Sequence, residues 1–241
     1  MPALAPLVAA HRAILVIDSA STAVQTGLYR RDRAPAWRQS HREAGIAVFT
    51  GAAEVLAEAG LQVRDVGACV FCEGPGSILG IRTAAMALRT WQAVRADALP
   101  AFAYRSLDLV AHALLAAGTR APFAVIADAR RDTWHCVAVD AGGPGPLRRL
   151  ARAELAGLDG TLFLPSGFRA WAAPPRPATE VPYLLSELWR GREQADLLRP
   201  APQPEAFLHE DPAYATWTPQ VHRPPAGGRR EPAPPGPRRG R

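Results

Sequence analysis

The chain has 241 residues, of which 48% are hydrophobic, and a formal net charge of +6. It contains no Lys and no Asn, which excludes a Walker lysine, a Schiff-base lysine and N-glycosylation. No apolar run approaches the roughly 18 residues of a membrane-spanning helix. The segment before Asp18 also lacks the basic region of a signal peptide, so we expect a cytoplasmic chain without membrane contact.

The positive charge is concentrated near the end of the sequence. From Val221 onward the chain has six Arg and one acidic residue, Glu231. This stretch is rich in Pro, Gly and Arg and has almost nothing to bury, so residues 223–241 are predicted to be a disordered tail. Such a tail could contact RNA electrostatically.

The first half of the sequence alternates between predicted strands and helices. Compact or alternating apolar runs predict strands at Ala13–Asp18, Val24–Arg30, Ala36–His41 and Ala68–Cys72. Longer apolar periodicity predicts helices at Glu43–Gly60, Ser77–Arg95 and Ser106–Ala117, with one further strand between the last two. Ser106 is the predicted N-cap of the third helix.

The second half has less regular structure. Phe123–Ala129 and Thr133–Asp140 are predicted to form a hairpin around ARRD, followed by a short strand at Thr161–Pro165 and a helix at Glu180–Trp189. Asp128 and Arg130 in the hairpin are interpreted as an ion pair or a turn. Proline-rich connectors at 172–177 and 199–204 separate the later elements.

Three cysteines bear on redox chemistry: Cys69, Cys72 and Cys136. The CVFC spacing resembles a redox pair, but such pairs lie at a helix N-terminus, where the thiol pKa falls. Here the surrounding residues predict a strand, on which positions three apart face opposite sides. We therefore expect buried, unpaired cysteines.

The stretch EGPGS at residues 73–77 is glycine-rich and precedes a helix. Gly74 and Gly76 permit left-handed backbone, and Ser77 is a good N-cap. Free amides at a helix start attract anions, so Asp18, Ser19, Gly74, Gly76 and Ser77 are candidate nucleotide or phosphate residues. The spacing matches neither a Walker loop nor a Rossmann fingerprint, and a structural turn is the favoured alternative.

The helices on either side of this loop each carry two apolar stripes, although a surface helix needs only one. The second stripe could lie inside the domain, or it could pack against helices of a partner. The small-residue stripes predict an interface formed by Gly45, Val48, Ala52, Val55, Ala59, Gly80, Ala84, Ala87 and Trp91.

Three segments resemble, in order, the signature motifs of the TsaB family, also called glycoprotease-like: ILVIDSAS (14–21), EGPGSILGIRTA (73–84) and IADARRDTWHCVAV (126–139). The segment PEAFLHEDPAYATW (204–217) resembles the closing motif of the family more weakly. The chain has Ser19 where the family has Thr, and Ile78 and Leu79 where the family has Phe and Thr.

The resemblance implies a sugar-kinase/actin-like α/β fold with two related halves, the second reduced. We assign residues 10–118 to the first half, 119–222 to the second and 223–241 to the tail. The resemblance also implies a non-catalytic subunit that supports its catalytic paralogue TsaD, together with the ATPase TsaE, in placing threonylcarbamoyl on a tRNA adenosine. It implies contact with tRNA only through the complex. The chain itself would require no cofactor. Self-pairing, and nucleotide binding at the complex interface, stay open.

No residues are predicted to be catalytic or to bind a metal. The TsaD family holds its metal through a pair of histidines spaced four apart. This chain has no such pair among its six histidines, which are His11, His41, His112, His135, His209 and His222. His41 and His112 are interpreted as surface or capping residues, and His135 as a packing residue. The alternative function is an active ATPase or phosphotransferase that uses Asp18 and the GPGS loop; in that case Asp18 would lie near metal and phosphate, rather than cap a turn.

Overall fold

The computed structural model describes residues 2–31 and 33–207. The predicted tail, His209 and His222 lie outside the described residues, as does most of the weaker closing motif. The division between residues 118 and 119 stays a prediction. Among the described residues, no helix is long and apolar enough to cross a membrane.

The first sheet is mixed and has the strand order β12-β5-β4-β1-β2-β3. Its strands are β1 (Ala13–Asp18), β2 (Val24–Arg30), β3 (Arg33–Ser40), β4 (Ala68–Gly74), β5 (Ala101–Arg105) and β12 (Arg199–Pro200). The three strands β1, β4 and β5 run parallel, whereas β2 and β3 continue from β1 as antiparallel neighbours. The strands predicted in this half are confirmed, with β3 beginning three residues earlier than expected.

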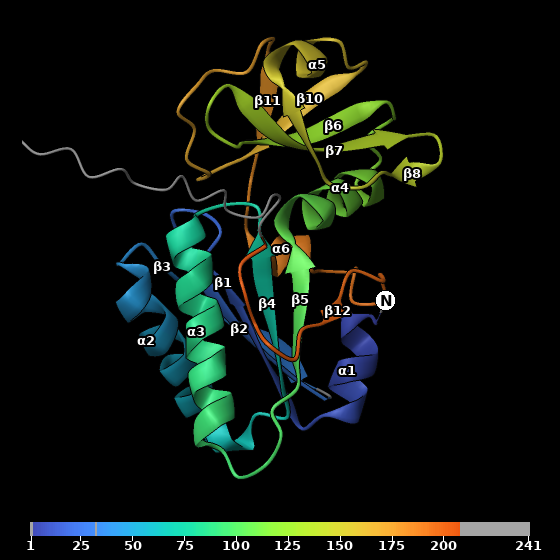
Figure 1. The fold of residues 1–241 in the computed structure, drawn as a ribbon. Helices are drawn as coiled ribbons and strands as arrows, with labels where there is room; N and C mark the ends of the chain where they lie inside the picture. The colour runs from blue at the N-terminus through green and yellow to red at the C-terminus, as the bar shows by residue number, and fades with distance from the viewer. Residues whose placement is uncertain (1, 32, 208–241) are drawn as a thin grey trace, which may run out of the picture. The chain divides into compact units, whose positions relative to one another are not determined.

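Both faces of this sheet are covered, which explains why β1 is apolar throughout. Ile14 and Val16 face a core that also contains Leu4 of the N-terminal helix, whereas Leu15 and Ile17 face the other core. Helices α2 (Ala44–Glu58) and α3 (Ile78–Val94) pack on the Leu15 side, and α1 (Leu4–Ala10) packs on the Ile14 side (Figure 1). The short helix η1 (Val63–Asp65) connects α2 to β4.

Helix α4 (Ser106–Ala116) lies between the first sheet and a second one (Figure 1). The second sheet has the order β11-β10-β6-β7-β8, and β9 also pairs with β7. Its strands are β6 (Phe123–Asp128), β7 (Thr133–Asp140), β8 (Gly143–Pro144), β9 (Arg148–Ala151), β10 (Thr161–Pro165) and β11 (Ala178–Val181).

The second sheet repeats the topology of the first. In each half an antiparallel hairpin comes first, and the first hairpin strand then pairs in parallel with a later strand, which pairs in parallel with the next. The helices differ, because the second half, as far as residue 207, has only the five-residue α5 (Arg152–Ala156) and the four-residue α6 (Leu185–Leu188). Two related α/β halves with a reduced second half are therefore confirmed.

Two sequence predictions of local structure were wrong, and one helix was missed. The predicted helix Glu180–Trp189 is strand β11 followed by the short α6, because residues 178–181 pair with β10. Helix α1 was not predicted. Ser106 is the first residue of α4 rather than its N-cap, and its hydroxyl donates to the carbonyl of Pro75 over 2.6 Å.

The cysteines are buried and unpaired, as expected. Cys69 packs in the core under α2 and α3, whereas Cys72 packs in the core on the opposite face of the sheet. Burial raises the pKa of Cys69 to about 12 and raises that of Cys72 as well. A redox pair is therefore excluded, because neither thiol is poised to ionise.

Candidate functional site

Asp18 ends strand β1 and is completely buried. Its carboxylate accepts hydrogen bonds from the hydroxyl groups of Tyr104 (2.6 Å) and Tyr183 (2.7 Å) and from the backbone amide of Ala20 (2.8 Å). Burial raises the pKa of this carboxyl group, against the opposing effect of the three donors. Both carboxylate oxygens are thus engaged by the chain's own groups, which favours the structural interpretation of Asp18 over a metal- or phosphate-binding one.

The glycine-rich loop packs directly on the loop that follows β1. Gly76 has a φ of +156°, and a Cβ atom there would lie 2.4 Å from the carbonyl oxygen of Ala20. A Cβ atom at Gly80 would lie 2.3 Å from the carbonyl oxygen of Ser19. These glycines therefore let two backbone segments approach each other closely, which is the structural role that their spacing favoured.

Ser77 is the N-cap of helix α3, as predicted. Its hydroxyl oxygen accepts a weak hydrogen bond from the amide of Gly80 (3.4 Å), and its own amide donates to the carbonyl of Ala20 (2.6 Å). Gly74, with a φ of +122°, completes the turn into this helix. The loop thus fixes the start of α3 against the β1–β2 connection.

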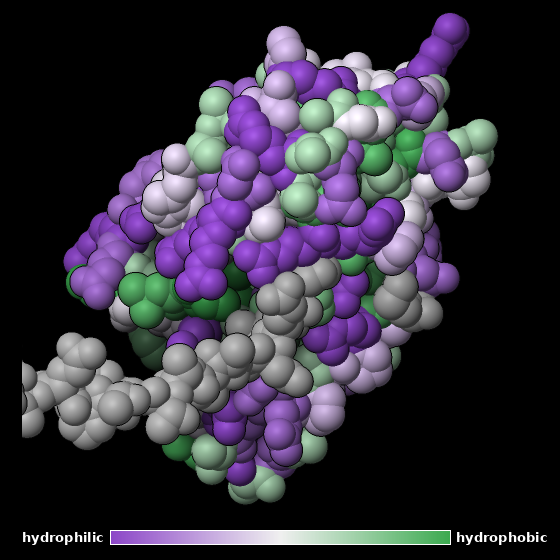
Figure 2. Space-filling model, turned by 45° about the horizontal axis from the view of Figure 1, so that its top comes forward, coloured by the Kyte–Doolittle hydropathy of each residue, from purple (hydrophilic) through white to green (hydrophobic). Residues whose placement is uncertain are grey.

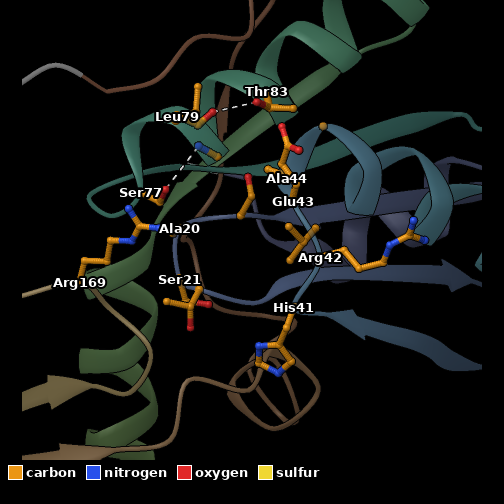
Figure 3. A pocket seen from close by; sticks show the side chains of 15 residues that line it. Ala20, Ser21, His41, Arg42, Glu43, Ala44, Ser77, Leu79, Thr83 and Arg169 are labelled. Atoms are coloured by element: carbon orange, nitrogen blue, oxygen red, sulfur yellow. Dashed lines mark hydrogen bonds between the residues drawn. The ribbon is translucent and has the colours of Figure 1, made fainter. Parts of the chain in front are cut away.

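A cavity of about 480 Å³ opens beside these loops, at the first turns of both α2 and α3 (Figure 3). Its lining residues are Ser19, Ala20, Ser21, Thr22, Val24, His41, Arg42, Glu43, Ala44, Gly45, Ser77, Leu79, Gly80, Thr83 and Arg169. Figure 3 shows the Arg169 side chain reaching toward Ser77 from the segment that follows β10. The backbone amide of Thr22 donates to the carbonyl of Gly167 over 2.8 Å and holds this segment in place.

The cavity separates the five candidate phosphate residues into two groups. Ser19 and Ser77 line it, whereas Asp18, Gly74 and Gly76 do not. The hydroxyl oxygen of Ser19 is buried without a hydrogen-bond partner. Amides at helix starts, a guanidinium group and hydroxyl groups suit an anion. Arg169 was missed in the sequence because it lies about 90 residues away in a segment without a motif.

The predicted partner interface is placed differently from the expectation. Val48, Ala52 and Val55 on α2 and Ala84 and Ala87 on α3 are at most 2% exposed. They form one core with the β1 side chains beneath them. Gly80 and Trp91 are also buried, Ala59 is half-buried and Gly45 is exposed. The buried members of these rows do not form an open docking face, because small residues here let the helices pack against their own sheet. For Gly45 and Ala59 the interface stays a prediction.

The outer sides of the same two helices carry exposed apolar side chains instead. Ile46 and Phe49 on α2 are 41% and 44% exposed, and Leu79 and Met86 on α3 are 73% and 55% exposed. The rings of Phe49 and Trp91 meet edge to face with centroids 6.0 Å apart, which connects the two helices. We call Ile46, Phe49, Leu79 and Met86 the α2/α3 apolar surface.

A second cavity, of about 350 Å³, lies beside α4 and β5. Glu73, completely buried, accepts hydrogen bonds from Arg105 (3.2 Å) and Arg199 (3.0 Å) at its edge. Burial raises the pKa of Asp108 to about 6, and the nearby Arg105 partly offsets this effect. Burial and the charge of Arg192 lower the pKa of His112. Glu73 is thus held in internal ion pairs, and Asp108 and His112 are half-buried. None of these groups is an exposed nucleophile.

No group of three or more potential metal ligands occurs within residues 2–31 and 33–207. His112 lies half-buried on α4 and His135 half-buried on β7, whereas His41 lines the first cavity. The histidine positions thus supply no metal site in this part of the chain.

Comparisons with known proteins give a match to a family model over part of the chain, and a fold. Residues 39–143 match the family described as TsaD, tRNA N6-adenosine threonylcarbamoyltransferase. No curated protein sequence matches the chain significantly.

Among solved structures, YeaZ (TsaB) from Pseudomonas aeruginosa matches with a TM-score of 0.56 and 22% identity, over 74% of this chain and 89% of that one. An uncharacterised protein with similarity to the peptidase YeaZ, also from P. aeruginosa, matches with a TM-score of 0.55 and 22% identity, over 74% and 88%. These matches show that the chain has the fold of YeaZ, and they agree with the predicted α/β fold of two related halves. Two findings support the resemblance to the TsaB family: residues 39–143 match the TsaD family model, and the chain has the fold of YeaZ.

Proposed function

We propose that this chain is the non-catalytic partner subunit of a complex that installs threonylcarbamoyl on the tRNA adenosine just after the anticodon. It would pair with the catalytic paralogue TsaD, and the ATPase TsaE would complete the complex. The observation that carries this proposal is the α2/α3 apolar surface, whose four side chains are 41–73% exposed. Both helices lie inside the region that matches the TsaD family.

A helical surface of this kind suits pairing with another helix pair. Exposing the apolar side chains of Phe49, Leu79 and Met86 to water costs about 25 cal/mol for each Å² of apolar area. Covering them with a partner would recover that free energy. The adaptable Met86 side chain suits an interface that must fit a non-identical partner, and it would also suit pairing with a second copy in isolation.

The environment of Asp18 favours the role of a non-catalytic subunit over catalysis by this chain. A phosphotransferase of this fold would need a carboxylate that is open to metal and phosphate. Asp18 is completely buried and bonded to Tyr104 and Tyr183. Opening it would break two buried hydrogen bonds and leave their donors unpaired, at a cost of about 1–3 kcal/mol for each.

The cavity with Ser19, Ser77 and Arg169 is the one observation that favours the alternative, an ATPase or phosphotransferase. Its helix starts and its guanidinium group suit a phosphate ester, but Asp18, the acid that the alternative function requires, does not line it. An ATPase or phosphotransferase is therefore the second candidate function. In the proposed role the chain needs no cofactor of its own, and it reaches tRNA through the complex.

Co-purification tests the pairing. Tagged TsaD from the same organism should retain the wild-type chain, and the substitution Met86→Asp should abolish retention while leaving the fold intact. The matched control is Ala153→Asp, which adds the same charge at an exposed position in the first turn of α5. Retention of Met86→Asp at the wild-type level would contradict the proposed surface. A wild-type chain that TsaD does not retain would contradict the proposed function itself.

A further inference from the structure

Two loops of the second half are tied together by a single carboxylate, that of Asp128. It accepts hydrogen bonds from the backbone amides of Arg130 (2.6 Å), Trp171 (2.7 Å) and Ala172 (2.9 Å). Arg130 belongs to the β6–β7 turn, and Trp171 belongs to the segment between β10 and β11. Asp128 therefore fixes the distance between these two loops through contacts that leave the side chains of Arg130 and Trp171 outside.

The β6–β7 turn has an unusual backbone for its sequence. Arg130, Arg131 and Asp132 have φ values of 64°, 50° and 56°, in the left-handed region that favours glycine. Tight hairpin turns with this geometry usually contain Asn-Gly. The amide of Thr133 closes the turn by donating to the carbonyl of Arg130 (3.0 Å), and the Thr133 hydroxyl donates to the same carbonyl (2.8 Å).

The surroundings thus hold two adjacent arginines in a strained turn at the end of a hairpin. Arg152 adds to this support by pairing with Asp132 at 3.3 Å and donating to the carbonyl of Ala173 (2.9 Å). A left-handed conformation costs free energy at each non-glycine residue. Strained backbone of this kind persists where the neighbouring structure imposes it, and it is frequent at binding sites.

The two loops present an aromatic ring together with guanidinium groups. Trp171 is 58% exposed, and the guanidinium carbon of Arg130 lies 4.4 Å from the centroid of its ring. An exposed tryptophan and a stacked arginine form flat surfaces on which unpaired bases stack. We call Arg130, Arg131 and Trp171 the Arg130–Trp171 surface.

The local charge is positive. Arg130, Arg131 and Arg152 contribute three guanidinium groups around the turn, and the carboxylate of Asp132 is paired with Arg152. The carboxylate of Asp128 is occupied by backbone amides. Within the part of the chain that is described, no carboxylate lies within 4.0 Å of the Arg131 guanidinium. Figure 2 turns the upper part of the Figure 1 view forward, and hydrophilic side chains cover much of the face that it shows.

We propose that the Arg130–Trp171 surface binds RNA with unpaired bases. Arg131 would contact phosphate groups, and the ring of Trp171 would stack on a base beside Arg130. The inference rests on the proposed function, which supplies tRNA as the RNA concerned, and it gives this chain a direct contact with the tRNA rather than one through TsaD alone.

The test measures binding of fluorescently labelled tRNA to the full-length chain by anisotropy at several salt concentrations. Trp171→Ala should weaken binding at least about five-fold, because a base loses its stacking partner. Arg131→Gln should lower the slope of log K against log salt by about 0.7, the value for one phosphate contact on a single strand. Arg64→Gln, at an exposed arginine of η1 in the first half, should change the slope by less. Binding of a blunt RNA duplex should be unaffected by Trp171→Ala.

Unchanged affinity of Trp171→Ala together with an unchanged salt slope of Arg131→Gln would overturn the inference. Binding that depends only on residues 223–241 would overturn it as well. Retention of each variant by TsaD is measured in parallel. If TsaD retains Trp171→Ala and the tRNA affinity of this variant is also unchanged, the RNA-binding inference fails while the proposed function stands. If TsaD does not retain the wild-type chain, the proposed function fails. Lost retention of Trp171→Ala with unchanged tRNA affinity would mean that the surface contacts protein, and would also overturn the inference.

Discussion

The hydroxyl group of Tyr183 donates a hydrogen bond to the carboxylate of Asp18 over 2.7 Å, although the two residues are 165 positions apart in the chain. Asp18 ends the first strand of the first half, and Tyr183 follows the last strand of the second sheet. Both are buried. This contact fastens a residue of the second half onto the position where a phosphotransferase of this fold would need an open acid.

Removing this carboxylate should therefore reduce stability rather than an activity. Asp18→Ala leaves the hydroxyl groups of Tyr104 and Tyr183 without their acceptor, and we expect a loss of about 3 kcal/mol in the free energy of unfolding. Tyr183→Phe should cost about 1–2 kcal/mol, because two donors to Asp18 remain. Urea unfolding measures both. Asp140→Ala, which removes an exposed carboxylate that also accepts a backbone amide, should cost less than either. ATP hydrolysis by the isolated chain that disappears in Asp18→Ala would favour the phosphotransferase instead.

Asp108 should make stability depend on pH. Its pKa of about 6 in the folded chain exceeds the value near 3.9 of an unfolded aspartate, so the folded state binds the proton more tightly. The associated stability is present below pH 4 and is lost as the pH rises to about 6. Asp108→Asn should therefore be more stable than the wild type at pH 7, by about 2 kcal/mol, and should lose this advantage near pH 4. Thermal unfolding of both chains at the two pH values checks the sign; a larger advantage at pH 4 would contradict it.

Two neighbouring positions on α3 should respond in opposite ways. Ala84 is 1% exposed, whereas Met86 is 55% exposed. Ala84→Arg would force a long cation into the core under α2 and α3 and should unfold the chain, at a cost of about 4 kcal/mol or more. Met86→Asp should fold normally. Circular dichroism and size-exclusion chromatography separate the two, and a well-folded Ala84→Arg chain would show that the small-residue row is open after all.

Glycines near the starts of α2 and α3 should also differ. A Cβ atom at Gly80 would meet the carbonyl oxygen of Ser19 at 2.3 Å, whereas one at Gly45 would meet only a side-chain oxygen of Glu43 at 3.8 Å. Gly80→Ala should therefore lower the free energy of unfolding by about 2 kcal/mol, because backbone must move. Gly45→Ala should raise it by up to about 1 kcal/mol through helix propensity. Equal effects of the two substitutions would mean that the Ser19 and Gly80 segments are not in close contact.

Much of the first half could be predicted from the sequence because its elements are long and strongly patterned. The buried run Ala13–Asp18 and the helices at Glu43–Gly60 and Ser77–Arg95 carry their own periodic signals and boundaries. The helix predicted at residues 180–189 was wrong because β11 forms through pairing with β10, and local propensity does not contain this long-range information.

The site was harder to predict than the fold. The motif at residues 14–21 singled out Asp18 and Ser19 together, and both are buried, but only Ser19 lines the cavity, whereas Asp18 bonds to Tyr104 and Tyr183. Both stripes on α2 and α3 are apolar, and only the sheet beneath them decides which one is buried. Arg169 and Tyr183 reach the site from positions without any motif, through contacts over long sequence separations.

Reconstituted threonylcarbamoyl transfer tests the central claim most directly. TsaD and TsaE from the same organism are supplied with threonylcarbamoyl-AMP and tRNA, with and without this chain, and modified adenosine is quantified. Transfer should require the chain, should be lost with Met86→Asp, and should persist with Ala153→Asp and with Tyr183→Phe. Equal transfer without the chain, or transfer by the chain without TsaD, would contradict its role as a non-catalytic partner.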